Sequence, residues 1–276
     1  MHPPRTDDSP DASRKAAPTR SDAPFYVALG LLGGLYVFLI AAMLVADLFF
    51  TSPLHLLRAL NTPEIRYSIN LSLVSCSASA SLSMLVAVPL GYLLSRTQFR
   101  GKTVVDTLLD IPIVLPPLVV GLSLLILFRV PPLRYLPITF QVPAVILAQF
   151  SVAAAFAVRT MRVTFDQISP RTEQVALTLG CTRFQAFYRV VLPEARRGML
   201  TAGTLAWARS LGEFGPILIF AGATPMKTEV LSTSVYLAMT VGNLETALAV
   251  SLLMVIVAVV VLVITRAFGM RENRVL

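Results

Sequence analysis

The chain has 276 residues, of which 55% are hydrophobic and 14% charged, and its net charge at pH 7 is +8. This composition is too apolar for a soluble globular domain. The basic residues gather in alternate loops and at the chain ends, so the positive charge indicates orientation in a membrane and argues against binding of nucleic acid.

Residues 1–24 are rich in Pro, Asp, Ser and Arg and nearly free of large apolar side chains. We expect this segment to be disordered, because it cannot bury enough apolar surface to fold. Six apolar runs of about 20 residues or more follow, the length at which a helix crosses a bilayer. They cover about residues 25–49, 67–94, 108–128, 142–160, 198–222 and 246–266. Because several runs contain proline, which packed neighbouring helices tolerate, we expect an all-helical bundle of six transmembrane helices in contact with membrane lipid.

Basic residues divide unevenly between the two sets of loops. Seventeen lie in the N-terminal tail, the loop after the second run, the polar stretch after the fourth and the C-terminal end, against five in the alternate loops. The positive-inside rule therefore predicts that both termini and the polar stretch are cytosolic. The expected parts are a disordered cytosolic tail (1–24), a first transmembrane helix with its external loop (25–66), a transmembrane domain (67–268) and a cytosolic C-terminal tail (269–276).

The polar stretch between the fourth and fifth runs predicts two short helices joined by a turn. Ser169 before Pro170 is a typical helix start, with proline at the first helical position. Gly180 is a typical helix stop. Thr182 and Gln185 have the spacing of a capping box for the second helix.

Apolar side chains of the second helix recur at helical spacing and predict an aromatic stripe. They are Phe184, Phe187, Tyr188 and Val191, and Pro193 is expected to end the helix. Two short helices with an aromatic face, held between membrane spans, are suited to dock into a partner protein. An ordinary amphipathic cytosolic loop is the alternative.

This stretch resembles the EAA loop of the permease subunits of ABC transporters, whose pattern is E-A-A, three residues, G, nine residues and I-x-L-P. Aligned on Gly180, the pattern ends on Leu192 and Pro193, which match it, and begins on Gln174, which does not. Glu173 lies one residue earlier, so any polar contact of the family's glutamate is open to question. The resemblance implies an ATPase-coupling loop formed by Glu173, Gln174, Val175, Ala176, Gly180, Phe184, Phe187, Tyr188, Leu192 and Pro193.

The motifs of several chemistries are missing from the sequence. Lys102 and Thr103 match the end of a Walker A motif, but Arg96 stands where its first glycine would be, so we expect no ATP hydrolysis in this chain. Its two histidines have no partners at ligand spacing, which predicts no metal site. We expect no cofactor here, with ATP and Mg bound instead by a partner ATPase.

The fifth run holds a pair of opposite charges next to a predicted helix break. Arg209 and Glu213 are four residues apart and can pair on one helix face. Gly212, Gly215 and Pro216 predict a break or kink beside them. Two hypotheses stay open: the pair is structural, or Arg209 attracts an anion at a gate in the pore.

The segment ARSLGEFG, residues 208–215, resembles the ARALGEFG segment of permeases for molybdate, tungstate and sulfate. Residues 227–253 extend this resemblance. It implies a type I ABC importer permease in a bacterial or archaeal cytoplasmic membrane, which moves an oxyanion, with molybdate expected first. The implied partners are a cytosolic ABC ATPase dimer, an extracytoplasmic oxyanion-binding protein and a second permease copy.

Alternatives remain within and outside this class. The substrate could be sulfate, thiosulfate or tungstate, and the second permease could be identical or related. A secondary transporter that needs no ATPase is the alternative from a different class. Such transporters usually contain internal repeats, and the two halves of this chain show no clear self-similarity.

Overall fold

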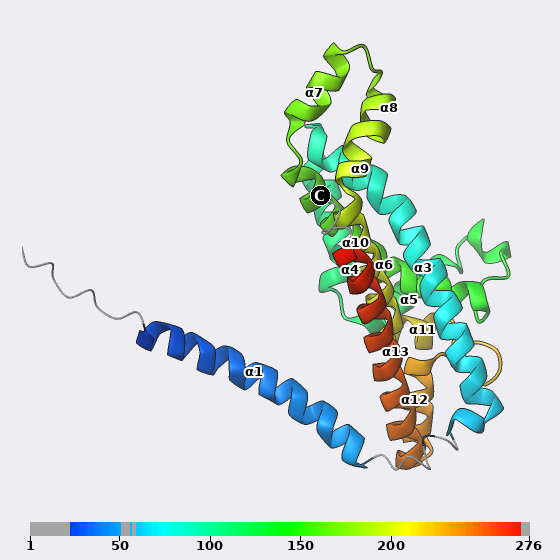
Figure 1. Ribbon diagram of the computed structural model, residues 1–276. Coiled ribbons are helices and arrows are strands. Elements are labelled where there is room, and N and C mark those ends of the chain that lie inside the picture. Colours follow the sequence, from blue (N-terminus) through cyan, green and yellow to red (C-terminus); the bar gives the residue numbers. More distant parts are fainter. Residues whose placement is uncertain (1–22, 51–55, 57–58, 272–276) are drawn as a thin grey trace, which may run out of the picture. The chain divides into compact units, whose positions relative to one another are not determined.

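The computed structural model of the chain describes residues 23–50, 56 and 59–271, and every regular element in these ranges is a helix (Figure 1). The chain divides into two compact units, Met1–Phe49 and Phe50–Leu276. The described part of the first unit lies entirely in α1 (Ala23–Phe50), an apolar helix whose only charged residue is Asp47. The tails predicted for residues 1–24 and 269–276 fall mostly on residues 1–22 and 272–276, which lie outside the described residues.

The second unit contains the helices from α3 to α13. They are α3 (Pro63–Arg96), α4 (Lys102–Val114), α5 (Pro117–Leu127), the 3₁₀ turn η1 (Leu133–Tyr135), α6 (Val142–Gln167), α7 (Pro170–Thr178), α8 (Arg183–Ala186), the π-helical turn η2 (Phe187–Val191), α9 (Leu192–Glu194), α10 (Arg196–Leu211), α11 (Gly215–Phe220), α12 (Leu231–Thr240) and α13 (Leu244–Arg271).

Among the described residues, four helices are long and apolar enough to cross a membrane. They correspond to the first, second, fourth and sixth predicted runs and lie in α1, α3, α6 and α13. The third run forms α4 and α5, which meet at a bend of 115° and count as a fifth span if they act together. The fifth run forms α10 and α11 with a break between them. The count of six spans therefore stays a prediction.

The core of the second unit forms where α3, α6 and α10 pack together, and small residues allow this packing. Ala87 on α3, Ala157 on α6 and Ala206 on α10 are all fully buried. A Cβ on Gly91 of α3 would lie 2.9 Å from the Cβ of Met161 on α6. Such close approach is how membrane helices associate, because lipid supplies no hydrophobic force between them.

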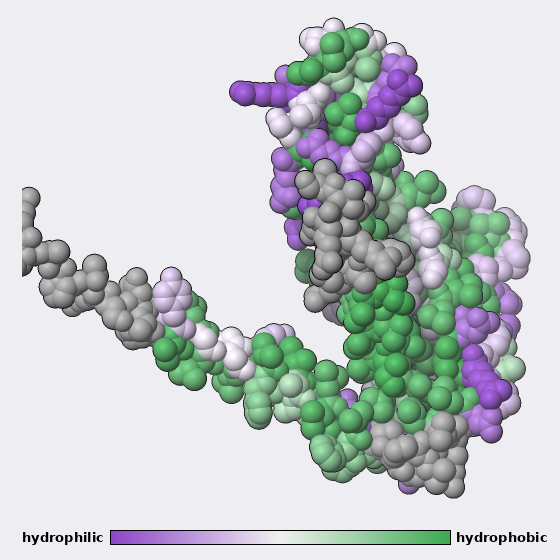
Figure 2. Space-filling model, in the orientation of Figure 1, coloured by the Kyte–Doolittle hydropathy of each residue, from purple (hydrophilic) through white to green (hydrophobic). Residues whose placement is uncertain are grey.

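The helices of the second unit run in both directions between its two ends. In Figure 1, α3, α6 and α13 lead toward the end at which α7 and α8 lie, and α10 leads away from it. Figure 2 shows apolar side chains over the coloured part of α13, and polar side chains near α7 and α8. The basic loop after α3 and the polar stretch between α6 and α10 therefore lie at the same end.

Candidate functional site

The first loop helix, α7, begins and ends as its sequence predicts. The Ser169 hydroxyl accepts a hydrogen bond from the backbone N–H of Arg171, with Pro170 at the first helical position. At the other end Gly180 has φ +89°. The N–H of Gly180 donates to the Leu177 carbonyl and that of Cys181 donates to the Ala176 carbonyl. This is a Schellman motif, in which the left-handed residue is usually glycine.

The second loop helix begins with the predicted capping box but does not end at Pro193. Gln185 N–H donates to the Thr182 hydroxyl, and Thr182 N–H donates to the Gln185 side chain at 2.9 Å. The chain then widens into the π-helical turn η2, in which Leu192 N–H donates to the Phe187 carbonyl. The prediction of a stop at Pro193 was wrong, because a widened turn relieves the clash of a proline ring with the preceding turn and the helix continues through α9.

The predicted aromatic stripe divides into two faces. Phe184 and Tyr188 are 74% and 61% exposed and stack at 6.2 Å between ring centroids. Phe187 instead turns inward, with its ring 4.6 Å from that of Tyr92 on α3, and Val191 is fully buried. Contacts with α3, which lies far away in the sequence, decide this division, so helical spacing alone could not reveal it.

The exposed side of the loop is apolar as well as aromatic. Val175 and Leu179 on the first half of the loop are 56% and 80% exposed, in addition to Phe184 and Tyr188 on the second half. We call these four residues the exposed loop face. Of the other predicted loop residues, Gln174 and Pro193 are exposed, Leu192 is half-buried and Ala176 is buried.

The acidic residue of the loop faces inward, whereas the glutamine beside it faces outward. Glu173 accepts a hydrogen bond from the Tyr92 hydroxyl at 2.5 Å, and its other carboxylate oxygen lies 3.4 Å from Nε of Arg96. Both partners belong to α3. The sequence pattern singled out Glu173, but nothing in it indicated Tyr92 and Arg96 as its partners.

The predicted break in the fifth run is present. α10 ends at Leu211, Gly212 follows it, and α11 starts at Gly215 with Pro216 in its first turn. Nη1 of Arg209 lies 2.8 Å from Oε1 of Glu213, so the predicted pair forms. The two side chains differ in exposure, 32% for Arg209 against 1% for Glu213.

The breaks in the third and fifth runs pack against each other, a contact that the sequence did not predict. A Cβ on Gly121 of α5 would lie 2.8 Å from Cα of Pro216 on α11. A Cβ on Gly215 of α11 would lie 2.9 Å from Cβ of Pro117 on α5. α5 and α11 thus each place a glycine against a proline of the other helix, and larger residues at the two glycine positions would push the helices apart.

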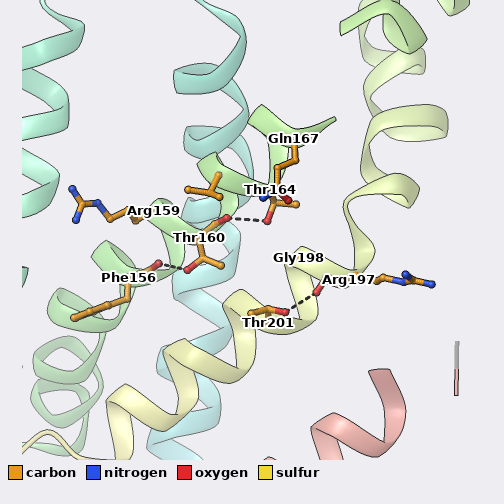
Figure 3. Close-up of a pocket in the computed structure, with 9 residues that line it drawn as sticks. Phe156, Arg159, Thr160, Thr164, Gln167, Arg197, Gly198 and Thr201 are labelled. Carbon is orange, nitrogen blue, oxygen red and sulfur yellow. Dashed lines mark hydrogen bonds between the residues drawn. The ribbon is translucent and has the colours of Figure 1, made fainter. Parts of the chain in front are cut away.

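A cavity of about 480 Å³ lies between α6 and α10 (Figure 3). Arg159 and Arg197 flank it, but Figure 3 shows their guanidinium groups directed away from each other. Arg159 is paired with Asp110 of α4 at 2.9 Å. The hydroxyls of Thr160 and Thr201 donate to carbonyls of their own helices. The cavity therefore does not present converging donors to an anion. Among the described residues, no group of three or more His, Cys, Asp or Glu side chains could hold a metal ion.

Relatives with curated names and solved structures are similar to this chain, and they include three permease proteins and one transporter structure. A "probable molybdenum ABC transporter permease protein" of Haloferax volcanii is 34% identical over 87% of this chain and 88% of its own length. A molybdate/tungstate transport system permease protein of Pyrococcus abyssi is 36% identical over 60% of this chain and 64% of its own length, slightly under two thirds of that protein. A sulfate transport system permease protein of Escherichia coli is 31% identical over 64% of this chain and 66% of its own length.

The solved structure is a bacterial alginate ABC transporter in complex with a periplasmic protein bound to an alginate pentasaccharide. It matches 91% of this chain and 95% of the compared chain with a TM-score of 0.71 and 18% identity, which shows the fold alone. The family model of binding-protein-dependent transport system inner membrane components matches residues 87–274. The chain therefore belongs to this family of inner-membrane transport subunits.

Proposed function

We propose that this chain is the permease subunit of an ATP-driven ABC importer that moves an oxyanion, molybdate first, across the cytoplasmic membrane. Family membership supports the class, and the names of the relatives from Haloferax and Pyrococcus support the substrate. The observation that carries the proposal is the exposed loop face. Four large apolar side chains exposed at the polar end of a membrane bundle indicate a surface that a partner protein covers.

The proposed partner at this surface is a cytosolic ATPase dimer, which holds ATP and Mg. Aromatic side chains that become buried are common anchors of protein interfaces, and Phe184 and Tyr188 already stack with each other. Both termini lie in the cytosol in this proposal, on the same side as the loop. An oxyanion-binding protein delivers substrate from the opposite side.

A second permease copy completes the proposed pore. Arg209 lies beside the break in the fifth run and about a third of its side chain is exposed. A charged group inside a membrane-spanning segment is costly against lipid, so we expect Arg209 to face water or another protein chain. Its guanidinium also lies 5.6 Å from the ring centroid of Phe156, which leaves only part of it to face the pore.

Sulfate is the second candidate substrate, and a related rather than identical second permease goes with it. The similarity to the sulfate permease of Escherichia coli favours this candidate. Thiosulfate and tungstate belong to the same group of tetrahedral oxyanions. A secondary transporter would not need a loop that docks an ATPase.

The test is reconstitution of the chain in vesicles with an ABC ATPase and an oxyanion-binding protein of its source organism. We expect molybdate uptake that requires ATP and stops when the ATPase carries a substitution of its Walker A lysine. Sulfate and tungstate measured in parallel identify the substrate.

A paired variant tests the docking surface itself. Phe184→Ala with Tyr188→Ala should release the ATPase on co-purification, while the melting temperature of the chain stays unchanged. Uptake that persists without ATP, or a double variant that retains the ATPase fully, would contradict the proposal.

A further inference from the structure

The inner side of the loop between α6 and α10 is attached to α3 by a compact cluster. The cluster combines Tyr92 and Arg96 of α3, Phe165 of α6, Glu173 of α7 and Phe187 of η2. Phe165 is fully buried, and the side chains of Arg96 and Glu173 are 13% and 14% exposed. The cluster therefore lies largely out of water, where a hydrogen bond to a charged carboxylate is strong.

Both halves of the loop meet at one tyrosine. The Tyr92 hydroxyl donates to the Glu173 carboxylate of the first half at 2.5 Å. The Tyr92 ring lies 4.6 Å from the Phe187 ring of the second half and 5.6 Å from the Phe165 ring. A displacement of either half of the loop would therefore change a contact of Tyr92 on α3.

Arg96 attaches the entrance of the loop to the same helix. Its Nη2 donates to the Ile168 carbonyl at 2.9 Å, directly before the cap of α7. Its Nε forms the ion pair with Glu173. The end of α6 and the start of α7 are therefore held by one guanidinium of α3.

This attachment lies opposite the surface that a partner would cover. Within α7, Glu173 faces α3 whereas Val175 and Leu179 are exposed. A force applied to the exposed loop face therefore passes through Glu173 to α3. Since α3 packs on both α6 and α10, it can pass this movement to the helix that carries the break in the fifth run.

We propose that Glu173 is a positioning residue that transmits movement of the loop to α3 through Tyr92 and Arg96. This inference rests on the proposed function, since the movement is attributed to the docked ATPase. Glu173 contacts neither substrate nor nucleotide in this role. It links the loop to a membrane helix that is far from the loop in the sequence.

The first test measures coupling in the reconstituted complex with Glu173→Gln and Tyr92→Phe. The first change removes the charge, and the second removes only the hydroxyl and keeps the ring against Phe187. We expect ATPase binding and hydrolysis to persist while oxyanion uptake per ATP falls roughly tenfold, the factor expected when a hydrogen bond to a charged group is lost. The double variant should be no worse than either single one, because the two groups act together.

The matched control is Glu194→Gln, which removes an exposed carboxylate of α9 by the same chemical change. It should leave uptake per ATP unchanged. Unchanged coupling in Glu173→Gln would overturn the inference. A loss of ATPase binding in proportion to the loss of uptake would also overturn it, since this would assign Glu173 to docking. So would a loss of uptake per ATP in the double variant equal to the product of the losses in the two single variants.

A second test needs neither substrate nor ATPase. Spin labels on Leu93→Cys of α3 and Thr178→Cys of α7, in a chain whose Cys76 and Cys181 are replaced by serine, report the distance between helix and loop. We expect one narrow distance distribution in the parent and in Glu194→Gln, and a broad one in Glu173→Gln and Tyr92→Phe. If the parent complex fails to import any oxyanion but this result holds, the proposed function falls and the attachment stands. Equally narrow distributions in all variants would overturn the attachment.

Discussion

At the scale of single residues, the pair in the fifth run is asymmetric. The Glu213 side chain is almost completely buried, whereas the Arg209 side chain is 32% exposed and lies over the Phe156 ring. An unpaired buried carboxylate is costly, while an unpaired guanidinium that reaches water is tolerated better. The two partners therefore contribute unequally to stability, and the geometry favours a structural role for the pair.

This asymmetry predicts an order among leucine variants. Arg209→Leu should be the most destabilising, by about 3 kcal/mol, because it leaves the Glu213 carboxylate buried without its partner. Glu213→Leu should cost less, and the double variant should recover expression and uptake relative to Arg209→Leu. Melting temperatures in detergent measure the stability of each variant, and uptake normalised to inserted protein measures its transport. If Arg209 instead attracts the anion, every variant that lacks it fails even when well inserted, and Glu213→Gln transports normally.

Gly180 supports a second prediction at this scale. Its φ of +89° is unfavourable for residues with a side chain, although a Cβ at this position would have no atom within 4 Å. Gly180→Val should therefore destabilise the turn by about 1–2 kcal/mol through backbone strain alone. The protein should insert normally but lose capture of the ATPase and uptake.

The matched control at this position is Gly180→Asn, because asparagine tolerates the left-handed conformation. It should retain most of the uptake. Equal activity of the valine and asparagine variants would mean that the conformation of this turn does not matter for coupling.

At the scale of elements, the two broken spans form one unit. Gly121 and Gly215 each accommodate a proline of the other break, so α5 and α11 pack more closely than any larger residue would permit. We expect this contact to keep the two breaks in fixed positions relative to each other.

The close packing predicts that a single methyl group is harmful at these positions. Gly121→Ala and Gly215→Ala should each lower stability by about 1–3 kcal/mol, since overpacking forces the backbones apart. Gly203→Ala is the control on α10, because its Cβ would lie 3.7 Å from Cγ of Met84, an ordinary contact. Thermal unfolding of the purified chain should separate the first two variants from the third. Equal melting temperatures for all three variants would argue against close packing of α5 on α11 at these glycines.

The sequence predicted those elements that depend on neighbouring residues. The caps at Ser169 and Thr182 and the turn at Gly180 are confirmed, because their hydrogen bonds close within a few residues. The π-helical turn before Pro193 was missed, since no residue pattern distinguishes it from an α-helix. The inward position of Phe187 depends on Tyr92, about ninety residues earlier, and no local pattern carries such information.

At the scale of the whole molecule, two contacts identify the opposite ends of the second unit. The Tyr67 hydroxyl donates to the Lys227 carbonyl at 3.1 Å, so the start of α3 lies beside the segment between α11 and α12. Arg96 donates to the Ile168 carbonyl, so the end of α3 lies beside the start of the loop. The α3 helix has 34 residues and is about 50 Å long at 1.5 Å per residue, enough to cross a bilayer of about 30 Å.

Reporter fusions can measure which of these two ends faces the cytosol. Fusions near Arg100, near Gly180 and after Arg271 should report cytosol, because the excess of basic residues lies at these positions. Fusions near Thr62 and Thr228 should report the outside.

A fusion to the N-terminal tail is an independent test, since the tail belongs to the first unit and the positive-inside rule alone predicts that it is cytosolic. An external Gly180 would remove the basis of the proposed function, because a cytosolic ATPase could not reach the exposed loop face. An external tail with a cytosolic Gly180 would leave that function intact and show instead that the chain crosses the membrane an odd number of times before the loop.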